Sequence, residues 1–181
     1  MERNITKEVI GKFEKINGVA IDLGCGEGYD SIYLIKNNWN VIAIDLFVEV
    51  IKKLTKKLDV NFKDNLTIKR QEFENLDIPK ADLILANYSI SYCKKEKFNL
   101  LINKIIESIK LNGRFAGIIY GEDDYRKDFE YMSFMTKEQF YKVFGEKFEI
   151  EIFREWRKKN IIKDTERINH TYEFIIRKIK E

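Results

Sequence analysis

The sequence predicts an α/β fold with a doubly wound, mostly parallel seven-stranded sheet and an antiparallel hairpin at its C-terminal end. Three observations predict it. Short apolar runs alternate with amphipathic segments over the first 120 residues, a glycine-rich turn follows the first apolar run, and the last third of the chain alternates apolar and polar residues. With 181 residues and no linker-like stretch, the chain is expected to form a single domain over residues 1–181.

The first half of the chain supplies alternating helices and strands. Apolar residues at helical spacing predict a helix over residues 5–16. We expect this N-terminal segment, residues 1–16, to cover the site, in front of a core formed by residues 17–181. The other elements expected here are strands over 19–23, 41–44 and 66–69, a helix that ends near Asn37-Asn38, and a helix over 47–58.

The second half completes the sheet. Its expected elements are a strand over 81–86, a helix over 98–109 capped by Asn112-Gly113, a strand over 115–120, and a helix that begins at the capping box of Thr136. Alternating residues predict two paired strands over 148–156 and 171–179. The polar stretch 157–169 is expected to be the loop between them.

Composition excludes several classes of protein. A hydrophobic content of 44% indicates a folded chain, and 33 Lys and Arg against 30 Asp and Glu give a net charge of +3, too small to predict nucleic-acid binding. Cys25 and Cys93 form no disulfide framework, and with His170 the only histidine, no metal site is expected. The sequence has no apolar run long enough to cross a bilayer and no signal peptide, so we expect a soluble, cytoplasmic protein without a membrane partner.

The strongest local signal is the run Asp22-Leu23-Gly24-Cys25-Gly26-Glu27-Gly28-Tyr29-Asp30, between the first expected strand and the helix that follows it. Its three glycines allow a tight turn and let a ligand lie against bare backbone. In an open Rossmann-like sheet, ligands bind at this carboxyl end of the first strand. The ordinary alternative is a strand–helix turn with a helix-capping acid.

The ligand predicted here is S-adenosylmethionine rather than a dinucleotide. A dinucleotide fingerprint requires its third glycine at position 29, which is Tyr29. Glu27 and Asp30 would place negative charge beside a pyrophosphate, whereas a sulfonium and an ammonium group suit an acidic turn. Asp45 ends the second strand, where a carboxylate can accept both ribose hydroxyl hydrogen bonds.

These residues resemble the class I S-adenosylmethionine-dependent methyltransferases. Residues 22–30 match the first motif of that family, Asp45 its second strand end, Arg70 to Glu74 the turn after its third strand, Ala86 to Ser89 the segment after its fourth, and Leu111 to Phe115 the turn into its fifth. The resemblance extends from about residue 16 to 178. Within the class, Asp30 and the segment from Tyr88 to Cys93 are similar to small bacterial enzymes of the tellurite-resistance type.

The resemblance implies positions for the cofactor and for its product, S-adenosylhomocysteine. Asp22, Gly24 and Gly26 should hold the methionine portion, within a turn that includes Cys25 and Gly28. Asp45 should hold the ribose and Leu46 should pack on the adenine. Glu72 and Phe73 should meet the adenine edge, and Asn87 and Tyr88 should line the sulfonium and acceptor side.

Two residues are candidates for catalysis. His170 has the only side chain with an unperturbed pKa near neutrality, and either it or Tyr88 is a candidate general base if the acceptor needs one. Tyr88, Tyr92 and Tyr120 follow strand ends, where their rings can bracket a sulfonium or simply pack at the rim of the sheet. The acids at 122–124 are interpreted as a solvated loop rather than a metal site.

The predicted reaction is direct displacement of the methyl group, with orientation and shielding as the main contribution of the protein. Little chain remains outside the core, so we expect a small-molecule acceptor. The alternatives are a nicotinamide dehydrogenase, a non-catalytic S-adenosylmethionine sensor or subunit, and a nucleic-acid or protein methyltransferase. Residues 87–90 lack the prolines of the motif common in base methylation at exocyclic amines. The sequence indicates neither the acceptor atom nor the oligomeric state.

Overall fold

The computed structural model describes residues 2–14, 18–47, 49, 53, 56, 64–162 and 165–181. A seven-stranded sheet forms its centre, with strand order β3-β2-β1-β4-β5-β7-β6. The first five strands in this order are parallel, whereas β7 pairs antiparallel with both β5 and β6. The prediction of a doubly wound sheet with an antiparallel C-terminal hairpin is therefore confirmed.

The elements follow the predicted alternation. In chain order they are α1 (Asn4–Ile10), β1 (Val19–Leu23), α2 (Tyr29–Lys36), β2 (Asn40–Asp45), β3 (Leu66–Arg70), the 3-10 helix η2 (Phe73–Asn75), β4 (Ala81–Asn87), η3 (Ile90–Tyr92), α4 (Lys95–Ser108), β5 (Ile109–Tyr120), α5 (Lys137–Phe144), β6 (Phe148–Ile162) and β7 (Thr165–Lys178). The helix expected over 47–58 lies, apart from isolated positions, outside the described residues.

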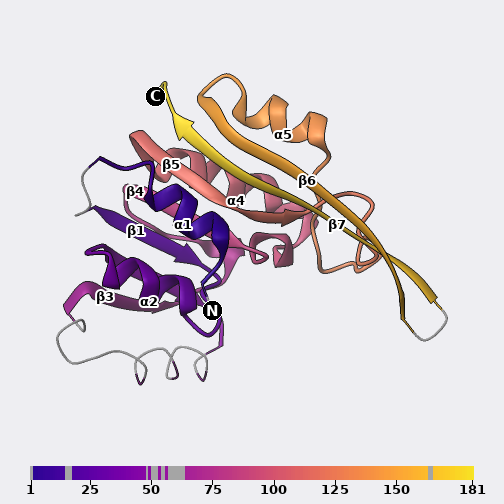
Figure 1. Ribbon diagram of the computed structural model, residues 1–181, viewed down its shortest axis with the longest axis horizontal. Helices are drawn as coiled ribbons and strands as arrows, with labels where there is room; N and C mark the ends of the chain where they lie inside the picture. Colours follow the sequence, from indigo (N-terminus) through magenta and orange to yellow (C-terminus); the bar gives the residue numbers. More distant parts are fainter. Residues whose placement is uncertain are drawn as a thin grey trace.

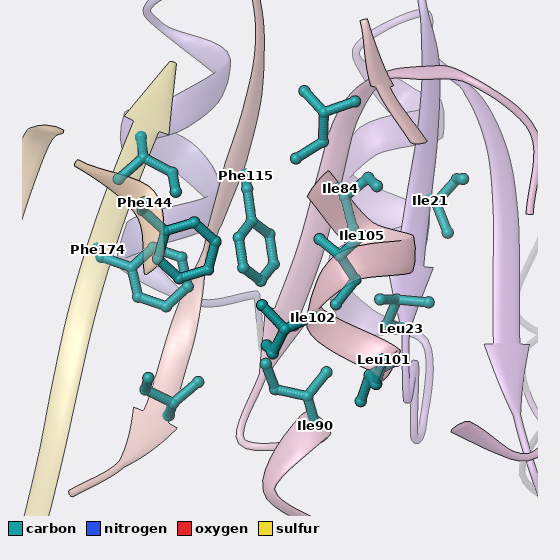
Figure 2. Close-up of a cluster of buried hydrophobic side chains, with 14 of the residues drawn as sticks. Ile21, Leu23, Ile84, Ile90, Leu101, Ile102, Ile105, Phe115, Phe144 and Phe174 are labelled. Carbon is teal, nitrogen blue, oxygen red and sulfur yellow. The ribbon is translucent and has the colours of Figure 1, made fainter. Parts of the chain in front are cut away.

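Helices cover both faces of the sheet (Figure 1). Alternate residues of the central strands point to opposite faces, so each strand contributes to two hydrophobic clusters. On one face, Ile21, Ile84 and Phe115 pack with α4 and α5, as Figure 2 shows for Ile102 and Ile105. On the other face, a second cluster packs the strands against α1 and α2. The two buried faces explain why the central strands β1 and β4 consist mostly of apolar residues.

The N-terminal helix is shorter than expected. It ends at Ile10, and the chain turns at Gly11, a residue that disfavours helix continuation. Phe13 then packs edge-on against the ring of Trp39, with 4.9 Å between the centroids. Helix α1 packs on the sheet face against β5 and β7. Arg3 and Thr6, at the start of the helix, donate hydrogen bonds to Asp30, close to the carboxyl ends of the strands.

The cap predicted at Asn112-Gly113 is wrong. Helix α4 ends at Ser108, and Ile109 already pairs with Ala81 in the sheet. Asn112 does have the predicted left-handed φ of 65°, but it lies within β5. The helix terminus is satisfied instead by Lys178, whose buried Nζ donates to the carbonyl oxygens of Ile106 and Ile109 at 3.2 and 3.0 Å. A capping partner 70 positions away leaves no local signal.

The loop expected over 157–169 is also wrong. Strand β6 continues to Ile162 and β7 begins at Thr165, and their pairing runs without interruption from Trp156↔Thr171 to Ile162↔Thr165. This two-stranded ribbon projects beyond the rest of the sheet (Figure 1). Most side chains of this ribbon are exposed, so neither of its faces requires apolar residues. The sequence therefore shows no apolar–polar alternation here, although both strands continue through it. Among the described residues, no helix is long and apolar enough to span a membrane.

Candidate active site

The candidate site lies where the sheet order reverses, because β1 is flanked by β2 on one side and β4 on the other. A topological switch point of this kind opens a crevice at the carboxyl ends of the strands. A cavity of about 760 Å³ occupies it. The residues that line the cavity are Gly24, Asp45, Leu46, Phe47, Gln71, Glu72, Phe73, Glu74, Asn75, Asn87, Tyr88, Ser89, Tyr92, Lys94, Glu96 and Lys97.

The glycine-rich turn after β1 requires its glycines. Gly24, Gly26 and Gly28 all have positive φ values, between 53° and 73°. At Gly24 a Cβ would lie 2.4 Å from the Cβ of Ser89, so the two segments approach too closely for any side chain. At Gly26 a Cβ would have no atom of the described residues within 4 Å, so this backbone borders open space.

Asp45 connects the turn to the end of β2. One carboxylate oxygen accepts the backbone N–H of Gly26 at 2.9 Å, and the other accepts that of Phe47 at 3.0 Å. Each carboxylate oxygen has two lone pairs, so both can still accept a hydroxyl hydrogen bond from a ligand in the cavity. Asp45 is therefore positioned both to shape the turn and to bind.

Asp22 lies beneath the turn rather than in the wall of the cavity. Its side chain is buried and accepts a hydrogen bond from the Ser31 hydroxyl at 2.5 Å. Burial, followed by the nearby charge of Asp30, raises the pKa of Asp22 to about 7. Cys25 is similarly buried, and burial raises the pKa of its thiol, which keeps it neutral.

Two side chains in the cavity wall carry buried oxygen atoms without a hydrogen-bond partner among the described residues. They are Oε1 of Gln71 and Oδ1 of Asn87. Their amide nitrogens are engaged, that of Gln71 with the carbonyl oxygen of Asp77 and that of Asn87 with Asp30 and Thr6. An unsatisfied buried acceptor costs about 1–3 kcal/mol, so a ligand that supplies N–H donors fits these positions.

The carboxylate of Asp30 joins three elements at this edge. Oδ1 accepts from the backbone N–H of Arg3 and from the Thr6 hydroxyl, both at 2.9 Å. Oδ2 accepts from the Arg3 guanidinium at 2.7 Å and from the Asn87 amide at 3.0 Å. Asp30 is almost fully buried, and these four bonds tie the start of α1, the start of α2 and the end of β4 together.

Tyrosines line one end of the site. Tyr88, directly after β4, has a φ of 61°, a conformation that is strained for a residue with a side chain and that often marks functional positions. Its ring lies 5.6 Å from that of Tyr120 and 5.4 Å from the Arg3 guanidinium. Burial raises the pKa of the Tyr88 hydroxyl. At neutral pH this hydroxyl is therefore protonated and is a hydrogen-bond donor rather than a base.

His170 is not among the residues of the cavity wall. It lies on β7 with a side chain that is 1% exposed. Nδ1 accepts the backbone N–H of Asp123 at 3.2 Å, and Nε2 lies 3.2 Å from a carboxylate oxygen of Glu155. With both ring nitrogens engaged away from the cavity, His170 has no geometry for the predicted role of general base there.

The acidic residues after β5 each serve a different structural partner. Glu122 accepts from the Tyr172 hydroxyl, Asp123 pairs with Arg157, and the buried Asp124 accepts from the backbone N–H of His170 and from Arg126. Within the described part of the chain no three potential ligand side chains form a metal-binding group.

Most of the residues predicted to bind the cofactor come together in the cavity wall. They are Gly24, Asp45, Leu46, Glu72, Phe73, Asn87 and Tyr88. Asp22, Cys25, Gly26 and Gly28 are not wall residues and form the turn behind it. The wall residues to which the sequence assigned no role include Gln71 and Lys94. Gln71 directly precedes the predicted Glu72, so an amide beside the adenine-facing acid was an available signal.

Comparison with known proteins assigns the chain to a family. A family model described as a methyltransferase domain matches residues 14–169, which include every strand from β1 to β5 and most of the C-terminal hairpin. The chain belongs to this methyltransferase domain family. The predicted resemblance to S-adenosylmethionine-dependent methyltransferases is thereby confirmed, and with it S-adenosylmethionine as the cofactor of the family.

Curated relatives of the methyltransferase domain match part of their own length. A carboxy-S-adenosyl-L-methionine synthase of Colwellia psychrerythraea is 24% identical over 107 residues, which are 56% of this chain and 44% of that protein. The ribosomal RNA small subunit methyltransferase C of Buchnera aphidicola is 26% identical over 140 residues, 72% of this chain and 41% of that protein. The chain thus spans less than half the length of these two relatives.

Solved structures share the fold of the domain. TehB from Haemophilus influenzae superimposes with a TM-score of 0.80 at 14% identity, over 97% of this chain and 62% of that one. A 1,6-didemethyltoxoflavin-N1-methyltransferase of Burkholderia thailandensis, solved with 1,6-didemethyltoxoflavin and S-adenosylhomocysteine, gives 0.69 at 16% identity, over 97% and 76% of the two chains. At these identities the likeness establishes the fold and not the acceptor.

Proposed function

We propose that this chain binds S-adenosylmethionine in the cavity at the carboxyl ends of β1, β2 and β4 and transfers its methyl group to a small acceptor. The observation that carries the proposal is the junction of Gly26 and Asp45, in which a carboxylate of the cavity wall holds the backbone of the glycine-rich turn behind the wall and still has free lone pairs for a ligand. The family membership and the fold support it. When bound, S-adenosylmethionine supplies an electrophilic methyl group on a positively charged sulfur.

The wall residues match the parts of this cofactor. Asp45 would accept hydrogen bonds from the ribose hydroxyls. Gln71, whose Oε1 has no hydrogen-bond partner among the described residues, would accept from the exocyclic amine of the adenine, beside the half-buried ring of Phe73 and the exposed side chain of Leu46. Asn87 Oδ1 would accept from the ammonium of the methionine portion, close to the turn at Gly24.

The acidic turn supports a cationic ligand. Asp22, Asp30 and Asp45 all lie at this end of the sheet; Asp45 borders the cavity, Asp22 with a pKa of about 7 is partly ionised at neutral pH, and Asp30 is paired with Arg3. A pyrophosphate at the same place would face these carboxylates. The charge distribution therefore favours S-adenosylmethionine over a nicotinamide dinucleotide.

The protein contributes to the reaction chiefly by orientation and exclusion of water. Tyr88 and Tyr92 form the wall beyond Asn87, where an acceptor would approach, and the ring of Tyr88 is held by Tyr120 and Arg3. Since the Tyr88 hydroxyl stays protonated and His170 lies elsewhere, no general base is assigned. We infer an acceptor that carries an available lone pair at neutral pH, such as a neutral amine, a thiolate or an oxyanion.

Calorimetric titration tests the binding part of the proposal. S-adenosylmethionine and S-adenosylhomocysteine should each bind with a stoichiometry of one, and NAD should not bind. Binding of NAD without binding of either sulfur compound would contradict the proposal and favour a nicotinamide dehydrogenase.

Turnover separates an enzyme from a sensor. Incubation with S-adenosylmethionine and a panel of small amines, thiols and oxyanions should produce S-adenosylhomocysteine with at least one acceptor. Tight binding of both sulfur compounds with no product for any acceptor, including cellular small-molecule and RNA fractions, would favour the non-catalytic alternative.

A further inference from the structure

We infer that Asp30 is a positioning residue for cofactor binding, which acts by holding the Asn87 amide in one orientation and by attaching the N-terminal segment to the site. This inference rests on the proposed function, because it concerns the same cavity. Asp30 itself is not a wall residue of that cavity. Its influence therefore has to pass through the side chains that it contacts.

The hydrogen bonds of Asp30 determine which end of the Asn87 amide faces which way. A carboxylate only accepts hydrogen bonds, so the amide group that lies 3.0 Å from Asp30 Oδ2 has to present its nitrogen. The Thr6 hydroxyl lies 3.2 Å from the same nitrogen. Consequently the carbonyl oxygen of Asn87 points away from Asp30 and is left without a partner among the described residues. The side-chain amide of a free asparagine can rotate by 180°, whereas these two hydrogen bonds fix the orientation of the Asn87 amide.

The orientation matters because it decides whether the wall offers an acceptor or a donor. An acceptor at Asn87 suits the ammonium of the methionine portion, whereas a donor turned toward the same group would repel it. A carboxylate directly on the wall would provide charge but no fixed direction. The arrangement at Asp30 instead keeps its charge buried and presents a neutral, oriented oxygen.

Arg3 and Thr6 complete the arrangement from the N-terminal side. The guanidinium of Arg3 compensates the charge of the buried Asp30 and lies over the ring of Tyr88 at 5.4 Å. Arg3 is the N-cap residue of α1 and Thr6 lies in its first turn, and both donate hydrogen bonds to Asp30. The same carboxylate thus connects the N-terminal segment, the cofactor-binding wall and the tyrosine of the acceptor side.

A double-mutant cycle tests the inference. The affinity for S-adenosylhomocysteine is measured by calorimetry for the wild type, Asp30→Ala, Asn87→Ala and the double variant, at a temperature where circular dichroism shows all four folded. If Asp30 acts through Asn87, each single substitution weakens binding by about tenfold and the double variant is also weaker by about tenfold rather than a hundredfold. Asp82→Ala is the matched control, because Asp82 accepts from Val19 and Lys110 at the opposite end of the sheet and should bind as the wild type does.

Exchange of the side chains at positions 30 and 87 gives a second test, which can be used even if the Asp30→Ala variant does not fold. Asn87→Asp places two carboxylates against each other and should weaken binding, whereas combining it with Asp30→Asn restores one donor and one acceptor across the contact. The exchanged variant should bind more tightly than either single variant and within about threefold of the wild type.

The outcomes are distinct. An unchanged affinity in folded Asp30→Ala, multiplicative effects in the double variant, or an exchanged variant as weak as the singles would each overturn the inference while the proposed function stands. A wild-type protein that binds no S-adenosylhomocysteine would overturn the proposed function itself and the inference with it.

Discussion

The Asp45 carboxylate accepts the backbone N–H of Gly26 across a distance of 2.9 Å, which links the two motifs identified in the sequence by a direct hydrogen bond. The two residues are 19 positions apart: Asp45 ends β2, and Gly26 lies in the turn after the neighbouring parallel strand β1. Because the bond occupies one of several lone pairs, it positions the turn without removing the carboxylate from ligand binding.

Asp45→Ala should weaken the binding of S-adenosylhomocysteine by about a hundredfold. The substitution removes the two proposed hydrogen bonds between the carboxylate and the ribose hydroxyls, each of which contributes about 1.5 kcal/mol or more. It also releases the backbone of Gly26 and Phe47. Calorimetry measures the affinity directly. Asp82→Ala, with its carboxylate at the far end of the strands, serves as the control and should keep the wild-type affinity. An Asp45→Ala protein that binds like the control would remove Asp45 from the site.

Substitutions at two glycines of the turn should separate stability from binding. Gly26→Ala introduces a side chain at a φ of 53° with no atom of the described residues within 4 Å, so it should cost about 1 kcal/mol of stability, and the strain at the junction with Asp45 should reduce affinity. Gly24→Ala has the same backbone strain and also a clash with Ser89, so it should destabilise by about 2–4 kcal/mol.

Thermal denaturation with and without S-adenosylhomocysteine distinguishes the two glycine effects. The Gly26→Ala variant should show a nearly normal midpoint that the ligand no longer raises. Equal loss of stability in both variants would show that the space beside Gly26 is filled.

The stability of the ligand-free protein should depend on Asp22 between about pH 4 and pH 7. Burial, and next the charge of Asp30, raises the pKa of Asp22 to about 7, above the ordinary value of 3.8, while Arg3 opposes and Asp45 reinforces the shift. The folded state therefore holds a proton that the unfolded state releases at lower pH. The contribution of this group to stability is present below about pH 4 and is lost as the pH rises through 7.

Denaturant titrations across this pH range measure the effect. Asp22→Asn should flatten the decline, because the introduced amide does not ionise. Saturating S-adenosylhomocysteine should also reduce the decline in the wild type, since its ammonium supplies positive charge near the carboxyl group. A pH dependence that is the same in the wild type and in Asp22→Asn would show that Asp22 titrates normally.

His170→Asn should lower stability without abolishing methyl transfer. The substitution keeps an acceptor near the backbone N–H of Asp123 but loses the contact with Glu155 and the ring packing on Tyr172, a loss of about 1–3 kcal/mol. Turnover at a temperature where the variant is folded should stay within about threefold of the wild type. A hundredfold fall in turnover with unchanged cofactor affinity would contradict this prediction and indicate that His170 takes part in catalysis.

The parts of the structure that the sequence predicted are those with local or periodic signals. Buried parallel strands such as β1 and β4 are continuous apolar runs, and the glycines at 24, 26 and 28 sit at positive φ, so both were visible in the sequence. Asp45 was placed correctly at the cavity because strand ends converge at one edge of a parallel sheet.

The parts that were wrong or missed depend on contacts distant in the chain. Lys178 caps α4 from 70 positions away, and the exposed ribbon of β6 and β7 has no buried face to impose alternation. His170 was predicted as a general base from its residue type alone. Its burial follows from the close approach of Gly121, where an added Cβ would lie 2.6 Å from the imidazole ring. Gln71 lies beside the predicted Glu72, but only the folded structure shows that its amide oxygen has no hydrogen-bond partner among the described residues.

A crystal structure of the complex with S-adenosylhomocysteine would show whether this cavity binds the cofactor. We expect the ribose hydroxyls to contact Asp45, the adenine amine to lie within hydrogen-bond distance of Gln71 Oε1, and the sulfur to point toward Tyr88. Clear density for the ligand outside this cavity, or an empty cavity in crystals grown with saturating ligand, would contradict this expectation.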